Sequence, residues 1–116
     1  MSTKMIETKN GTVAVIHSDS TIITDGQSAL DFAVNAGAQL IIVNKAAIAE
    51  DFFKLSTGIA GEVVQKFVNY GYSLAIVGDF SVYTSKPLRD YIYECNKGSH
   101  LFFAEDEQMA IDKLGG

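Results

Sequence analysis

Residues 48–67 read IAEDFFKLSTGIAGEVVQKF, residues 72–81 read YSLAIVGDFS, and residues 85–98 read SKPLRDYIYECNKG. The middle segment holds a short apolar run that stops at Gly78-Asp79, which predicts a buried strand. The segments on either side repeat apolar residues every three or four positions, which predicts two amphipathic helices. A strand between two such helices is typical of an α/β domain.

The first of these helical patterns contains an interruption. Apolar residues recur from Asp51 to Tyr70, but the stretch includes Gly58, and a glycine inside a helix costs about 1 kcal/mol relative to alanine. We therefore expect a break at Ser56-Thr57-Gly58 and a main helix from there to Asn69.

The chain before residue 48 predicts a hairpin, a helix and a strand. Asn10-Gly11 lies between two strand-like segments, residues 4–9 and 12–16, and both residues tolerate the positive φ of a type I′ turn. Thr24 and Gln27 fit a capping box at the start of a helix. The remaining expected elements are a strand at residues 40–43, a helix from Ser85 to Gly98, a strand at residues 100–103 and a helix at residues 106–114.

The predicted order of elements is β-β-α-β-α-β-α-β-α, so the expected fold class is α/β. Strands that alternate with helices favour right-handed crossovers and a mainly parallel sheet, here with one antiparallel edge strand from the hairpin. We expect one domain over residues 1–116, because 116 residues is close to the usual domain size. The periodic apolar positions predict a core of Val13, Val15, Leu30, Ile41, Val43, Ile59, Val63, Phe67, Leu74, Ile76, Leu88, Ile92, Leu101 and Phe103.

The charge of the chain argues against two classes of partner. The net charge is −5, and only nine lysines and arginines are spread along the sequence, whereas nucleic acids and membrane surfaces bind basic faces. We therefore expect no nucleic-acid and no membrane partner. The N-terminal residues lack the apolar core of a signal peptide, and Cys95 is the sole cysteine, so we expect a cytoplasmic protein.

Seven polar or glycine residues are candidates for a binding site. Ligands of open α/β sheets bind outside the carboxyl ends of the parallel strands, beside the starts of the following helices. Asp79 directly follows a strand, where it can contact a ligand or accept hydrogen bonds from its own loop. The backbone amides at the break can bind an anion, or they can simply cap the helix. The candidates are Ser56, Thr57, Gly58, Asp79, Ser81, Lys86 and Arg89.

Topology predicts that Ser56, Thr57 and Asp79 lie at the same end of the sheet. Asp79 follows a parallel strand, and in a right-handed crossover the main helix starts at that same end. We expect these residues to share a rim across a shallow cleft that Phe80 and Tyr83 partly cover.

The sequence contains no complete catalytic or metal-binding set. His17 and His100 lie far apart, with no third residue spaced to complete a zinc site. No serine or cysteine can be paired with a histidine and an acid. We expect no catalytic residue, no metal and no cofactor. The sequence leaves enzymatic activity open but favours a non-enzymatic protein.

The segment Leu55-Ser56-Thr57-Gly58-Ile59 and the element order resemble the sulfate-transporter and anti-sigma-factor-antagonist domain, called the STAS domain. That family carries Asp-Ser-Ser-Gly-Leu at the start of its main helix, and the first serine is the regulatory phosphoacceptor in the antagonist members. The resemblance implies a STAS-like fold with Ser56 as the phosphoacceptor. Leu55 departs from the family pattern, which has an acidic residue there.

Three longer segments are similar to an uncharacterised bacterial family, domain of unknown function 4180. They are DFFKLSTGIAGEVVQKFVNYG at residues 51–71, LAIVGDFSVYTSKPLRDYIYECNKG at residues 74–98 and LFFAEDEQMAIDKL at residues 101–114. On these segments the chain is identified as a member of that family. The resemblance implies no activity.

Two functional hypotheses follow. The first is a non-enzymatic regulatory or protein-interaction module that binds another protein through the Ser56-Thr57 turn and the helix that begins near Ser85. The alternative partner is a second copy of the chain, which would form a homodimer. The second is a sensor of a small anionic molecule, or a small enzyme. In that hypothesis Asp79 acts as an acid, base or hydrogen-bond acceptor, and Lys86 or Lys45 supplies the positive charge.

Overall fold

Residues 1–115, which a computed structural model describes, form strands and helices in the predicted order, and Gly116 lies outside the described residues. The strands are β1 (Ser2–Thr8), β2 (Gly11–His17), β3 (Leu40–Asn44), β4 (Ser73–Val77) and β5 (Leu101–Ala104). The helices are α1 (Gly26–Ala36), α2 (Ile59–Tyr70), α3 (Lys86–Cys95) and α4 (Glu107–Gly115). Short 3₁₀ turns at Lys45–Ala47, Glu50–Phe53 and Leu55–Thr57 connect β3 to α2.

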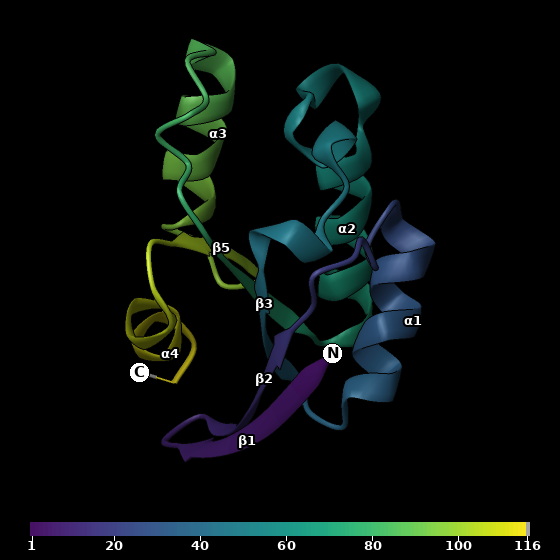
Figure 1. Cartoon of the computed structure of the whole chain (residues 1–116), viewed down its shortest axis with the longest axis vertical. Helices are drawn as coiled ribbons and strands as arrows, with labels where there is room; N and C mark the ends of the chain where they lie inside the picture. Colours follow the sequence, from purple (N-terminus) through teal and green to yellow (C-terminus); the bar gives the residue numbers. More distant parts are fainter. Residues whose placement is uncertain (116) are drawn as a thin grey trace.

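The strands lie in one sheet in the order β1-β2-β3-β4-β5 (Figure 1). β1 pairs antiparallel with β2, and all later neighbours are parallel. Each step along the chain adds the next parallel strand on the same side of the last one, so right-handed crossovers place α1, α2 and α3 on one face. α4 covers the other face. The predicted α/β class, with a mainly parallel sheet and one antiparallel pair, is confirmed.

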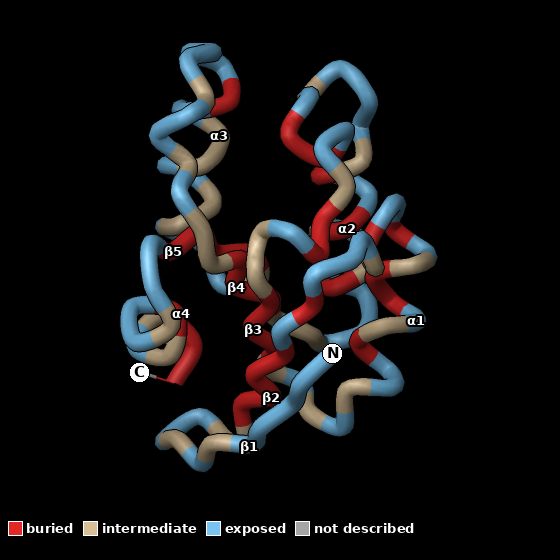
Figure 2. Tube along the Cα trace, viewed as in Figure 1, coloured by how far each residue is buried: buried red, intermediate tan, exposed pale blue. Residues whose placement is uncertain are grey.

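Apolar side chains fill both faces of this sheet. Ile41 and Val43 of β3 point to the face that α1, α2 and α3 cover, whereas Ile42 between them packs with α4. Figure 2 shows the inner strands as the buried centre of the molecule. The expected core residues are all buried except Ile59 and Ile92, which are partly buried.

Two local turns differ from the sequence prediction. The hairpin loop is Lys9-Asn10, and positive φ occurs only at glycines within residues 1–115, so the predicted type I′ turn is wrong. The cap of α1 is Asp25 instead of Thr24. The extended backbone of Asp25 lets its carboxylate accept a hydrogen bond from the Ser28 amide at 2.8 Å, while the Ser28 hydroxyl accepts one from the Asp25 amide at 3.0 Å.

The predicted break before α2 is confirmed at Gly58. Its φ of 76° lies in the left-handed region, which glycine enters without a steric cost. The Thr57 hydroxyl lies 2.8 Å from the carbonyl oxygens of both Asp51 and Lys54, which holds the preceding turn in place. Ile59 then begins the helix.

We expect Gly58→Ala to lower the free energy of unfolding by about 1–2 kcal/mol, because alanine is strained in the left-handed region. Gly61→Ala is the matched control. Gly61 lies inside α2 with open space where a Cβ would be, so its replacement should stabilise the protein by up to about 1 kcal/mol. Urea unfolding measures both. A stabilised Gly58→Ala variant would mean that the helix continues through this position in solution.

Candidate functional site

The parallel strands end on one side of the sheet, the upper side in Figure 1. At the ends of β2 and β3 the polar residues have a structural role. The Asn44 side chain donates to the Ser18 carbonyl oxygen at 2.7 Å and accepts from the Ser18 amide at 2.8 Å. This contact extends the β2–β3 pairing beyond the last backbone pair, and Ser18 is buried by it. The polar residues after β4 and β5 are left to form a site.

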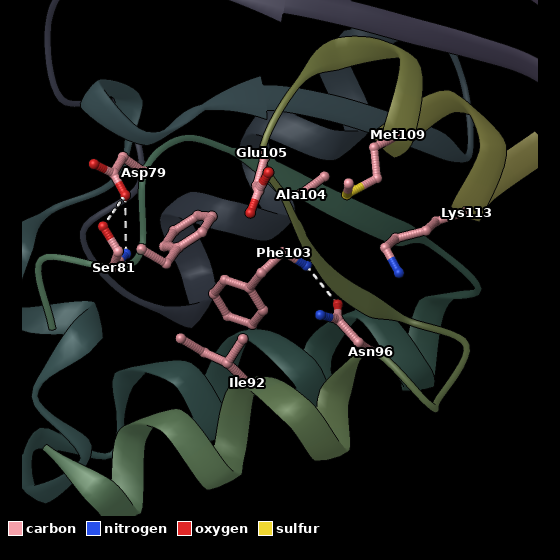
Figure 3. Close-up of a pocket in the computed structure, with 10 residues that line it drawn as sticks. Asp79, Ser81, Ile92, Asn96, Phe103, Ala104, Glu105, Met109 and Lys113 are labelled. Carbon is pink, nitrogen blue, oxygen red and sulfur yellow. Dashed lines mark hydrogen bonds between the residues drawn. The ribbon is translucent and has the colours of Figure 1, made fainter. Parts of the chain in front are cut away.

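A hollow of about 270 Å³ lies beyond the ends of β4 and β5, and we call it the Asp79 hollow. Figure 3 shows Glu105 near the Phe103 ring, and the Asp79 carboxylate turned toward Ser81 at one side of the hollow, while residues of α3 and α4 contribute its remaining walls. The rings of Phe80 and Phe103, together with Ile92, Ala104 and Met109, supply the apolar part of its lining. The full lining is Asp79, Phe80, Ser81, Ile92, Asn96, Phe103, Ala104, Glu105, Met109 and Lys113.

Asp79 is held by its own loop. Its Oδ1 atom accepts hydrogen bonds from the Ser81 hydroxyl at 2.5 Å and from the Ser81 amide at 2.9 Å. The hydroxyl contact first, then the amide and the charge of Lys45, lower the pKa of Asp79 below its ordinary value. Asp79 is therefore ionised at neutral pH, with its second oxygen outside these hydrogen bonds.

Carboxylates dominate the charge of the Asp79 hollow. Asp79 and Glu105 both line it, and Lys113 is the one lysine or arginine in the lining. Within residues 1–115, neither Glu105 nor Lys113 forms an ion pair. An arrangement of this kind attracts a cation more strongly than an anion.

The two lysines that the sequence suggested as cations for Asp79 do not line the hollow. The Lys86 ammonium forms an ion pair with Asp90 at 2.7 Å. The Lys45 ammonium lies 5.0 Å from the centre of the Tyr83 ring and 3.9 Å from the Glu50 carboxylate. Lys45 therefore acts on Asp79 only as a neighbouring charge.

Four rings form an aromatic brace beside the hollow: Phe53, Phe80, Tyr83 and Phe103. Phe53 stacks on Tyr83 with centroids 4.9 Å apart, and Phe80 meets Phe103 edge-on at 5.2 Å. The Tyr83 hydroxyl donates to the Glu50 carboxylate at 2.7 Å. Burial, followed by the contact with Glu50, raises the pKa of Tyr83. The brace ties the turns before α2 to the loop before α3.

The structure separates the candidate residues into two groups. Asp79 and Ser81 line the Asp79 hollow. The parallel pairing of β3 with β4 places the start of α2 at the same end of the sheet, as expected. Neither Ser56 nor Thr57 lines the Asp79 hollow, so a cleft shared by the two groups stays a prediction. The candidates outside the hollow are Ser56, Thr57, Gly58, Lys86 and Arg89, all exposed.

His100 and Cys95 carry side chains that are reactive in many enzymes, but here their surroundings favour a structural role. His100 Nδ1 lies 2.9 Å from the Tyr72 carbonyl oxygen. Burial raises the pKa of the Cys95 thiol, so that the reactive thiolate is disfavoured. Within residues 1–115, no three histidine, cysteine, aspartate or glutamate side chains gather as a metal site would require.

A family model described as "Domain of unknown function (DUF4180)" matches residues 8–114. No curated protein and no solved structure matches the chain. Across residues 1–115, no helix combines the length and the apolar character that crossing a membrane requires.

We expect Ser81→Ala to raise the pKa of Asp79 toward its ordinary value, because the serine hydroxyl is the largest cause of the lowered pKa. The carboxyl carbon shift of Asp79, followed by NMR during a pH titration, measures the change. Ser56→Ala, on the neighbouring turn, is the control and should leave that pKa unchanged. The stability linked to ionised Asp79 is present above the pKa of the unfolded chain and is lost as the pH falls through the folded-state pKa. An unchanged pKa in Ser81→Ala would contradict the assignment.

Proposed function

The chain belongs to the family described as Domain of unknown function (DUF4180), and from its geometry we propose that it is a non-enzymatic regulatory or protein-interaction module of STAS-like fold. The element order and the serine-containing turn of residues 55–59 before α2 support the STAS-like part of this proposal. The proposed setting is the cytoplasm of a bacterial cell, and the proposed partner is another protein.

The surface proposed to bind this partner, which we call the tip surface, consists of exposed residues from two distant segments. Ser56, Thr57 and Gly58 come from the turn before α2, and Lys86 and Arg89 come from the start of α3. Lys86 is paired with Asp90, so Arg89 supplies the positive charge that suits a partner with an acidic patch.

The observation that carries the proposal is the aromatic brace beneath the tip surface. The Phe53–Tyr83 stack and the Tyr83–Glu50 hydrogen bond fix the Glu50–Phe53 turn against the loop that leads into α3. The Thr57 hydroxyl donates to the Asp51 carbonyl oxygen of that turn, which connects the tip surface to the brace. A surface that is already ordered loses less conformational entropy on binding than two independent loops would. Exposed side chains above a rigid support are therefore better suited to recognition than to a catalytic step.

Ser56 gives the tip surface a means of regulation under the same proposal. Its side chain is exposed and makes no hydrogen bond within residues 1–115, so its hydroxyl is accessible to a kinase. A phosphate there would add negative charge to the tip surface and weaken binding to an acidic partner. This is the role that the STAS resemblance assigns to the corresponding serine.

We expect Arg89→Glu to reduce the capture of the partner from an extract of the source organism by about tenfold or more, a change of about 1.4 kcal/mol. Lys9→Glu makes the same charge reversal in the hairpin loop, at the far end of the sheet, and should leave capture unchanged. Both side chains are exposed, so both variants should keep the wild-type unfolding midpoint. Equal capture by wild type and Arg89→Glu, or a loss with Lys9→Glu alone, would exclude the tip surface.

The Asp79 hollow supports a second candidate function, the binding of a small molecule. The hypothesis from sequence was an anionic ligand, but the geometry favours a ligand that carries a protonated amine. Asp79 and Glu105 can accept its hydrogen bonds, and the rings of Phe80 and Phe103 can contact its apolar part. A volume of about 270 Å³ suits a molecule of amino-acid size.

A thermal-shift screen tests this second candidate with phenethylamine, putrescine, phenylalanine, phosphate and acetate as probes. A ligand at 100 times its dissociation constant adds about 2.7 kcal/mol of stability, which is readily detected. We expect the amines to stabilise the wild type, phosphate and acetate to have no effect, and Glu105→Gln to abolish the shift. Glu94→Gln, on the exposed face of α3, is the control that should retain it. Stabilisation by phosphate alone would restore the anionic hypothesis.

A further inference from the structure

The two edges of the sheet differ in how they are protected. At one edge, β5 has four residues, and the Asn96 side chain accepts a hydrogen bond from the Phe103 amide at 2.8 Å. At the other edge, β1 has seven residues in unbroken register with β2 and contains no proline. No strand within residues 1–115 pairs with its outer side. Edge strands usually carry a bulge, a proline, a cover or an exposed lysine that blocks further pairing. β1 has no bulge and no proline, and its one lysine, Lys4, is held in an ion pair with Glu107.

β1 also exposes apolar side chains on the face that α1 shares. Met1 is 85% exposed and Met5 is 51% exposed. Met1 and Thr3 line a groove together with Phe32 of α1. A strand added beside β1 would cover apolar surface here as well as satisfy backbone hydrogen bonds.

The other face of β1 is already engaged within the chain. The Lys4 ammonium forms an ion pair with Glu107 of α4 at 2.8 Å, and Ile6 packs against the apolar cluster under α4. These contacts point away from the plane of the sheet, so that an incoming strand can pair without displacing them.

We propose that a second copy of the chain covers this edge. Its β1 pairs antiparallel with the first β1 about a two-fold axis perpendicular to the sheet, and the two sheets become one sheet of ten strands. Met5 lies at the axis, opposite the partner's Met5. Thr3 then lies opposite the partner's Glu7, and Lys4 lies opposite the partner's Ile6.

The side chains of β1 select this register. The two-fold axis places α1 of both copies on the same face of the joined sheet. Because alternate residues of a strand point to opposite faces, the axis must then pass beside one residue of β1, which lies opposite the same residue of the partner. Lys4 at the axis would place two ammonium groups in direct opposition, and Glu7 would do the same with two carboxylates. Met5 is the middle residue of Ser2–Thr8, so an axis there pairs all seven residues of the strand. An axis at Ile6 would leave the first residues of the strand unpaired.

The choice of a second copy over an unrelated strand rests on this self-complementarity. The strand has one positive and one negative side chain, and the Met5 register brings no like charges together. The exposed Met5 side chains of the two copies meet at the axis. The proposed tip surface lies at the end of the sheet and stays free in this dimer, so the two proposals are independent of one another.

Sedimentation velocity over micromolar to millimolar concentrations tests the dimer with the full chain. We expect the wild type to have twice the monomer mass. Met5→Lys places two ammonium groups at the axis and should give the monomer, and its circular dichroism spectrum should match that of the wild type, because Met5 is half exposed. Val34→Lys is the matched control: Val34 is exposed on α1, and its replacement should leave the dimer intact. A monomeric wild type, or a dimer that Met5→Lys leaves intact, would overturn the proposal.

Cysteine crosslinking tests the register. In a Cys95→Ser background, Met5→Cys should form an intermolecular disulfide on mild oxidation, seen by non-reducing electrophoresis. Glu7→Cys, on the same face of the same strand, should not crosslink alone, because its symmetry mate lies four residues away, about 14 Å at 3.4 Å per residue. A mixture of Thr3→Cys and Glu7→Cys proteins should crosslink. Crosslinking of Glu7→Cys alone, or none with Met5→Cys, would exclude the register and require a different interface or a foreign strand.

Discussion

Right-handed crossovers between parallel strands that lie in sequence order place α1, α2 and α3 on one face of the sheet. This constraint determines much of the remaining structure. It gathers the larger apolar cluster on the face with three helices and leaves the other face to α4. It also brings the ends of the parallel strands and the starts of their crossover helices to the same side of the molecule, where the tip surface and the Asp79 hollow are found.

Most of the fold can be predicted from the sequence, because the period of the apolar residues sets which elements form and which faces they bury. The break at Gly58 is predictable for the same local reason, since glycine is unfavourable inside a helix and free of strain at positive φ. The capping of α1 is not predictable to the residue. Thr24 and Asp25 are both acceptable caps, and the extended backbone conformation that selects Asp25 is visible only in the structure.

The candidate site is predicted in part. The position of Asp79 follows from the strand before it, and Glu105 could have been included by the same rule, because it follows β5 directly. The aromatic brace could not have been predicted from the sequence. Phe53 lies in the stretch that the sequence predicts as helical, whereas in the structure it ends a 3₁₀ turn and stacks on Tyr83, thirty residues further along the chain. The net negative charge of the hollow likewise depends on which lysines turn away from it, as Lys45 and Lys86 do.

Because α4 alone covers one face of the sheet, that face depends on the order in which the chain is synthesised. Val13, Val15 and Ile42 belong to strands that leave the ribosome early, yet the helix that buries their face is the last element of the domain to be synthesised. The face under α1, α2 and α3 can close as each crossover is completed, whereas this second face stays open to water until translation reaches α4. A growing chain therefore exposes these apolar side chains until α4 has been made, and exposed apolar surface of this kind is what chaperones bind.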